Sequence, residues 1–132
     1  MKVLLLVTLL IYPLVSCTKN DAVSPKPVNK GIEPAFSSFS ASAKKNGAEV
    51  QFTAKNESSV AYYEVFSGTD GHQLCIVSRL TPSTQKSEAH TYTYDDIHPE
   101  GDPMYYMIGY VLKDSTLKFN GQMVTLRFSK TD

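Results

Sequence analysis

Apolar and polar residues alternate with a period of two in this chain, and that alternation constrains its fold more than any other feature. It is clearest at residues 48–54, where polar residues separate Val50 and Phe52. Because successive side chains of a strand point to opposite faces of a sheet, one face of this segment would be buried and the other would meet water. No stretch of the sequence shows a sustained repeat of 3.6 residues, so we expect little helix.

Turn-forming residues divide the chain into short segments. Asn46-Gly47 and Asp70-Gly71 are clear examples, since both pairs suit tight turns, and Asn120-Gly121 would make either a bulge or another turn. Residues 104–113 are apolar on both faces, which is typical of a central strand. The expected strands are residues 39–43, 48–54, 61–67, 73–80, 90–94, 104–113 and 117–128. Six to seven short strands predict an all-β fold, a single antiparallel β-sandwich.

The start of the chain carries a different signal. Lys2 precedes an apolar run at residues 3–11, and Pro13 ends that run before Leu14-Val15-Ser16-Cys17. A positive start, a short apolar run and a small residue before a cleavage site are typical of an export signal. The apolar run is too short to span a bilayer and is broken by Pro13. Both features argue against the alternative of an uncleaved transmembrane helix.

The four residues that end this signal, Leu14-Val15-Ser16-Cys17, resemble the lipobox of bacterial lipoproteins. The resemblance implies cleavage after Ser16 and acylation of Cys17 by palmitate or a similar chain, which would tie the protein to a membrane. It implies a place in the cell envelope, at the outer membrane, and leaves the periplasmic or surface orientation open. With Cys17 acylated, Cys75 would have no disulfide partner and would be a small buried apolar residue.

The sequence divides into three parts. Residues 1–16 would be the signal peptide, residues 17–35 the lipidated cysteine and a flexible tether, and residues 36–132 the sandwich. The tether contains Pro25, Pro27 and Pro34 but no aromatic residue. Such a segment buries too little apolar surface to fold, and its prolines would keep it semi-extended.

A series of motifs follows residue 36. They are residues 50–54, Glu57-Ser58-Ser59, Tyr63-Glu64-Val65, Asp70-Gly71, Tyr92-Thr93-Tyr94-Asp95-Asp96, Gly101 and Tyr105-Tyr106. Their order resembles the fibronectin type III-like sandwich common in secreted and surface proteins of Bacteroidota, over about residues 36–128. Phe52 stands where that family usually has tryptophan, a departure that affects the subfamily rather than the fold. The resemblance implies an immunoglobulin-like sandwich that serves as a spacer, an adhesion module, a carbohydrate-associated module or a docking surface.

Charge and motif content argue against several functions. The chain has 13 basic and 13 acidic residues and no run of five basic residues, so we expect no nucleic acid partner. It contains no Gly-x-Ser-x-Gly, phosphate loop or paired-carboxylate motif, so we expect no catalytic residues and no enzyme activity. His72, His90 and His98 lack the close spacing of metal ligands, so we expect neither a metal nor a cofactor.

Two turn regions leave alternatives open. Carboxylates in the loop from Asp95 to Asp102 could bind calcium, or the loop could be a solvated turn capped by Asp96. Asp114-Ser115-Thr116 matches a short O-glycosylation signal of Bacteroidota at Ser115, and a plain β-turn would explain the same residues.

Aromatic residues suggest a binding surface. If Tyr63 and Val65 face the core, then Tyr62 and Phe66 face outward, and Tyr105 would join them from a neighbouring strand as part of an exposed patch. Exposed aromatic side chains often mark protein or sugar contacts. Cross-strand aromatic pairs would explain the same residues without any partner.

These observations together favour a non-catalytic, lipid-anchored recognition or adaptor module. It would hold an envelope protein or a glycan on the patch of Tyr62, Phe66 and Tyr105, or on the loops at residues 81–89 and 95–103. The alternative is a structural spacer or a stabilising subunit of an envelope complex. A small inhibitor or an enzyme is less favoured, because no motif supports it.

Overall fold

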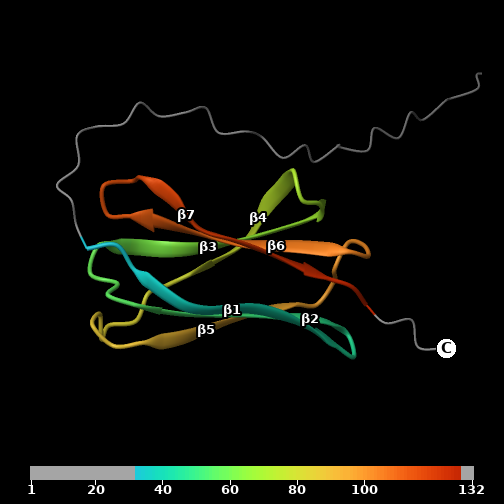
Figure 1. Ribbon diagram of the computed structural model, residues 1–132, viewed down its shortest axis with the longest axis horizontal. Coiled ribbons are helices and arrows are strands. Elements are labelled where there is room, and N and C mark those ends of the chain that lie inside the picture. Colours follow the sequence, from blue (N-terminus) through green and yellow to red (C-terminus); the bar gives the residue numbers. More distant parts are fainter. Residues whose placement is uncertain (1–31, 129–132) are drawn as a thin grey trace, which may run out of the picture.

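The computed structural model describes residues 32–128, which form seven β-strands and no helix (Figure 1). The strands are β1 (Ala35–Lys44), β2 (Gly47–Lys55), β3 (Val60–Asp70), β4 (Gln73–Leu80), β5 (His90–Asp96), β6 (Met104–Leu112) and β7 (Leu117–Leu126). The predicted all-β fold of six to seven strands is confirmed. Over the described range, no helix that could cross a membrane is found. The predicted signal peptide, Cys17 and most of the tether lie outside that range and stay predictions.

The strands make two antiparallel sheets that lie one above the other (Figure 1). One sheet has the order β1-β2-β5 and the other the order β4-β3-β6-β7. β4 pairs with β3, and the chain then crosses to the other sheet, where β5 pairs with β2. Two packed antiparallel sheets with this crossing connection form an immunoglobulin-like β-sandwich. β6 lies between β3 and β7, as its apolar character on both faces predicted.

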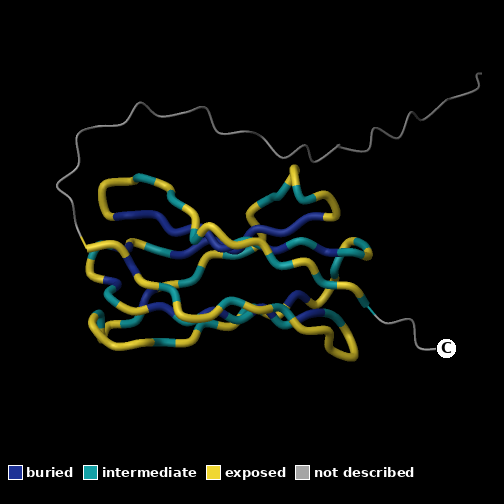
Figure 2. The backbone as a smooth tube through the Cα atoms, viewed as in Figure 1, coloured by how far each residue is buried: buried dark blue, intermediate teal, exposed yellow. Residues whose placement is uncertain are grey.

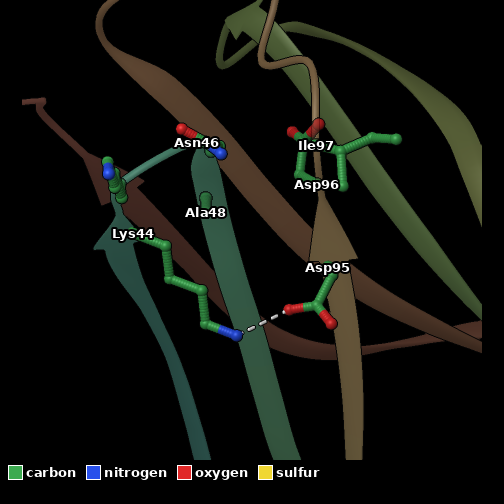
Figure 3. Close-up of a pocket in the computed structure, with 8 residues that line it drawn as sticks. Lys44, Asn46, Ala48, Asp95, Asp96 and Ile97 are labelled. Atoms are coloured by element: carbon green, nitrogen blue, oxygen red, sulfur yellow. Dashed lines mark hydrogen bonds and ion pairs between the residues drawn. The ribbon is translucent and has the colours of Figure 1, made fainter.

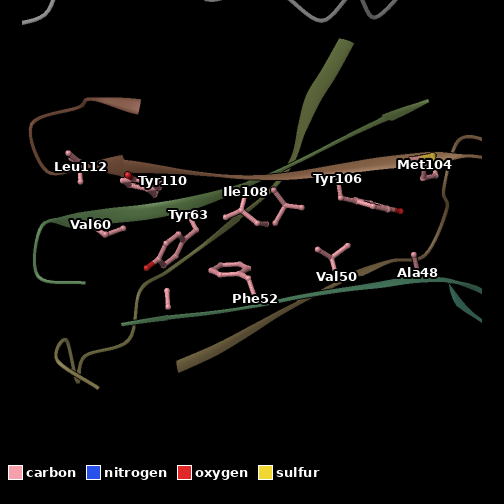
Figure 4. Close-up of a cluster of buried hydrophobic side chains, with 12 residues drawn as sticks. Ala48, Val50, Phe52, Val60, Tyr63, Met104, Tyr106, Ile108, Tyr110 and Leu112 are labelled. Atoms are coloured by element: carbon pink, nitrogen blue, oxygen red, sulfur yellow. The ribbon is translucent and has the colours of Figure 1, made fainter. Parts of the chain in front are cut away.

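The core lies between the two sheets (Figure 4). Val50 and Phe52 of β2 are buried against side chains that include Tyr63 of β3 and Ile108 of β6. The rings of Phe52 and Tyr63 are 5.0 Å apart between centroids and meet edge to face. Figure 2 shows that the buried stretches follow the strands, whereas most of the exposed residues lie in loops and on outer surfaces. Burial of each large side chain contributes roughly 1.5–3 kcal/mol, so the period-two pattern is also the main source of stability.

A buried carboxylate joins the sheets at one end of the sandwich. Glu57, in the connection between β2 and β3, is fully buried. Its Oε1 accepts hydrogen bonds from the hydroxyls of Tyr63, at 2.6 Å, and Tyr92, at 2.5 Å. The Tyr92 hydroxyl in turn accepts the N–H of Ser83 at 2.7 Å, and the N–H of Glu57 donates to the carbonyl of Lys86 at 2.8 Å. The Glu57 side chain therefore links β3 to β5, and its backbone N–H and the Tyr92 hydroxyl tie in the loop between β4 and β5.

The opposite end of the sandwich is closed by a tight hairpin and by Asp96. The β1–β2 hairpin turns at Lys45 and Asn46, in the predicted place, and Gly47 follows with a φ of 150°. Asp96 accepts the hydroxyl of buried Tyr106 at 2.7 Å and the N–H of His98 at 3.3 Å. The hydrogen bond from the N–H of His98 is the cap of the loop by Asp96 that the sequence predicted.

The first described residues are attached to the sandwich. The Ser59 hydroxyl donates to the carbonyl of Ile32 at 2.5 Å, and Glu33 forms an ion pair with Lys118 of β7. The Tyr110 hydroxyl of β6 also donates to Glu33, at 3.3 Å. Before β1 begins, the chain therefore contacts the β2–β3 connection and two strands of the four-stranded sheet.

Candidate partner-binding surface

The three predicted patch residues share one face of the molecule, the outer face of the β4-β3-β6-β7 sheet. Tyr63 and Val65 are buried between the sheets, so Tyr62 and Phe66 point the opposite way along β3. Tyr105 on β6 is paired with Gly68, two positions beyond Phe66 on β3. The predicted direction of these side chains therefore agrees with the structure.

Phe66 faces outward but is far less exposed than a binding patch requires. Only 9% of its surface is accessible. A Cβ atom added to Gly109 would lie 2.8 Å from Phe66 Cε2, so the ring covers β6 at its glycine. The ring also packs against Phe119 of β7, with centroids 5.3 Å apart. The expectation that Phe66 is an exposed aromatic residue is therefore wrong, because its neighbours cover it.

Exposed apolar side chains of this face come from β7, which the predicted patch did not include, and from β4, where Ile76 lies opposite Phe66 and is 43% exposed. Phe119 and Met123 are each 46% exposed and Leu117 is 44% exposed. Strict alternation along β7 fails, because the pairing register between β6 and β7 shifts between Met107 and Gly109. The Asn120-Gly121 pair was the only sequence signal of this irregularity, and it did not distinguish a bulge from a turn.

An open hollow of about 220 Å³ lies on this face. Its lining consists of Phe66, Gly71, His72, Leu74, Met107 and Phe119. Only His72 brings a polar side chain to it, so the hollow suits an apolar group. We call the hollow together with exposed Leu117 and Met123 the apolar patch.

Beside the apolar patch, Tyr62 belongs to a polar cluster. Arg79 of β4 donates from Nε to Glu64 Oε1 at 2.9 Å, and its guanidinium carbon lies 4.9 Å from the centroid of the Tyr62 ring. The Glu64 side chain is buried, whereas that of Arg79 is 62% exposed. Arg79 was not singled out from the sequence, and Glu64 appeared only in the Tyr63-Glu64-Val65 motif, because nothing along the chain shows that β3 and β4 bring the two side chains together.

A second, larger hollow of about 490 Å³ lies at the end of the β1–β2 hairpin (Figure 3). Lys44 Nζ donates to Asp95 at 2.8 Å and also forms an ion pair with Glu49. Hydrogen bonds to Asp95 and then to Glu49 raise the pKa of Lys44 above its usual value. Within residues 32–128 no group of three or more possible metal ligands is found, and calcium binding by the loop from Asp95 stays untested.

Ser115 and Cys75 both lie on the four-stranded sheet or its connections. Ser115 lies in the β6–β7 turn with a φ of 71°, where the Asp114 side chain accepts the N–H of Thr116 at 3.0 Å. This turn supports the β-turn interpretation and leaves glycosylation a prediction. Cys75 on β4 is disulfide-bonded. The expectation that it would have no disulfide partner therefore does not hold in this structure.

No protein-family model and no curated protein matches the chain. Its fold resembles that of OgpA from Akkermansia muciniphila, with a TM-score of 0.57 and 14% sequence identity over 76% of this chain and 28% of OgpA. A catalytically inactive OgpA in complex with an O-glycopeptide (glycodrosocin) substrate gives a TM-score of 0.55, with 14% identity over 76% of this chain and 30% of that one. The chain thus spans less than a third of OgpA, and at this identity the likeness concerns the fold alone.

Proposed function

We propose that the chain is a non-catalytic, lipid-anchored module of the cell envelope that recognises a partner with the outer face of its four-stranded sheet. The observation that carries the proposal is the apolar patch. Its exposed residues Phe119 and Met123 adjoin a hollow lined by Phe66 and Met107. Aromatic and methionine side chains are enriched in protein interfaces, so a protein partner fits this surface better than a glycan does.

The membrane part of the proposal is supported by sequence. The lipobox at residues 14–17 and the proline-containing tether would place a folded module near a membrane without any transmembrane helix. Cys17 and Cys75 are the only cysteines, so a lipid on Cys17 and an intramolecular disulfide exclude each other. Whether Cys75 forms an intramolecular disulfide in the mature protein therefore tests the lipid anchor directly.

A glycan remains the second candidate partner. Catalytically inactive OgpA has been crystallised with an O-glycopeptide, and the fold of this chain is similar to 30% of that protein. That similarity gives no activity to this chain, and the apolar lining of the hollow argues for protein contact.

The test is crosslinking of the tagged, full-length lipoprotein in its native membrane, with a photoreactive amino acid placed at position 119. We expect one stoichiometric protein adduct that disappears when Met123→Ser is added to the crosslinking chain. A photoreactive residue at position 97 is the matched control, because Ile97 is 67% exposed but lies outside the apolar patch. The same protein adduct in equal yield from positions 97 and 119 would contradict the proposal. An adduct with a glycan at position 119 would show that the partner is a glycan and not a protein.

A further inference from the structure

We propose that Arg79 is a preorganised binding site for a carboxylate of the partner protein, beside the hollow that takes an apolar side chain of the same partner. The proposal rests on the proposed function, and it names the chemistry of the partner. It depends on Arg79 of β4, which the sequence did not single out, and on Tyr62 and Glu64 of β3.

Two contacts fix the guanidinium of Arg79 before any partner arrives. Its Nε donates to Glu64, whose side chain is only 4% exposed and so cannot move freely. Its guanidinium carbon lies over the Tyr62 ring, 4.9 Å from the centroid. Arginine side chains lose much rotamer freedom on binding, and an arginine that is already held in place loses less.

The exposed part of the guanidinium is the part that binds carboxylates. Arginine has five N–H donors, and within residues 32–128 only the Nε–H of Arg79 is used in a hydrogen bond or ion pair. The two terminal nitrogens therefore keep their donors, and the side chain is 62% exposed. A planar fork of N–H donors matches the two oxygens of a carboxylate.

Strand register places this site beside the apolar patch. Glu64 lies opposite Arg79 on β4 and opposite Gly109 on β6, and Gly109 lies opposite Phe119 on β7. Arg79 and Phe119 thus lie in one row across the face, three strand spacings apart, or roughly 14 Å. An extended chain rises about 3.3 Å per residue, so one strand could place an acidic and an apolar side chain about four residues apart on both sites.

The chemistry of the face favours a peptide over a sugar. A sugar needs several polar groups to bind its hydroxyls, whereas His72 alone brings a polar side chain to the hollow. An acidic residue and an apolar residue on one segment satisfy both Arg79 and the hollow.

The experiment uses the full mature chain in detergent and an array of synthetic decapeptides as the probe. Each peptide carries one Glu and one Phe, with the spacing between them varied. We expect the tightest binding at a spacing of about four residues. Replacement of that Glu by Gln should weaken binding about tenfold, as expected for the loss of a charged hydrogen bond.

Variants of the protein separate this proposal from the general one. Arg79→Ala would leave the Glu64 carboxylate buried without its partner. Two other variants are therefore compared, the double variant Glu64→Gln/Arg79→Gln and the single variant Arg79→Lys. Both should lose the preference for Glu over Gln, and Lys45→Ala, an exposed control, should keep it. Phe119→Ala should instead lose the requirement for Phe.

Each outcome decides between the two proposals. Binding that depends on Phe119 but not on the peptide carboxylate would overturn the role of Arg79 and leave the recognition function standing. The absence of binding by any peptide would also overturn it, and the crosslinking experiment would then decide the recognition function independently. A preference for Glu that survives in both Arg79 variants would assign the carboxylate to another residue.

Discussion

Gly109 determines the shape of the outer face at the scale of single residues. Without a side chain at this position, the Phe66 ring can lie over β6 and reach Phe119. Sequence alone gave the direction of Phe66 correctly, because its neighbours alternate on a strand. It could not give the exposure of Phe66, since that depends on a glycine and an aromatic residue more than 40 positions away.

Gly47 provides the first prediction. A Cβ added to it would lie 2.0 Å from the carbonyl oxygen of Asp96, and its φ of 150° suits only glycine. We expect Gly47→Ala to lower the free energy of unfolding by about 3 kcal/mol. Urea denaturation of the full mature chain would measure this change.

Gly121 supplies the matched control for that substitution. Its φ is 78°, and no atom lies within 4 Å of an added Cβ. Gly121→Ala should therefore cost only about 1 kcal/mol, the backbone penalty alone. Equal effects at the two glycines would show that the close approach at Asp96 does not matter.

At the scale of elements, the strands and most of their turns were predictable, whereas the pairing between distant strands was not. The seven expected strand segments correspond to β1–β7, and the signals at Asn46-Gly47 and Asp70-Gly71 fall at turns between strands, whereas Asn120-Gly121 lies within β7. Alternation and turn chemistry are local properties, so a single sequence carries them. The shifted register of β6 and β7, and the pairing of Glu64 with Arg79, depend on contacts between distant segments and could not be predicted.

Glu57 connects elements from both sheets, and it gives the second prediction. Burial, followed by the hydrogen bond to Glu57, raises the pKa of Tyr92 to about 12, and the same two causes raise the pKa of Tyr63. A tyrosine whose folded pKa exceeds its unfolded value of about 10 stabilises the fold fully below pH 10. That contribution is lost as the pH rises from about 10 to 12.

Unfolding free energies measured from pH 8 to pH 12 would check this expectation. The wild type should be constant up to about pH 10 and should then fall. Tyr92→Phe should reduce the slope of the fall, whereas Thr91→Val, at an exposed hydroxyl of the same strand, should leave it unchanged. A slope that is the same in Tyr92→Phe and the wild type would show that this tyrosine is not coupled to folding.

The whole molecule raises the question of the anchor, which gives the third prediction. We expect the mature wild-type protein to carry lipid on Cys17 and to sediment with membranes, because Cys17 ends a segment that resembles a lipobox. Cys17→Ala should remain unprocessed or become soluble. Intact mass and membrane fractionation would measure both properties.

The two cysteines supply the control for this prediction. Iodoacetamide labelling before and after reduction would report the state of Cys75. A wild-type mature protein with an intramolecular disulfide and no added lipid mass would contradict the anchor, since the sulfur of Cys17 cannot be in both bonds.

The attachment of Glu33 to β7 also has a mechanical consequence. Lys118, which holds Glu33, is the immediate neighbour of Phe119 on the same strand. Tension between an anchored N-terminal side and a partner held at Phe119 would therefore load the contacts of Glu33 with Lys118 on β7 and Tyr110 on β6. Both strands belong to the four-stranded sheet that carries the apolar patch, so the module would join membrane and partner through neighbouring strands of one sheet.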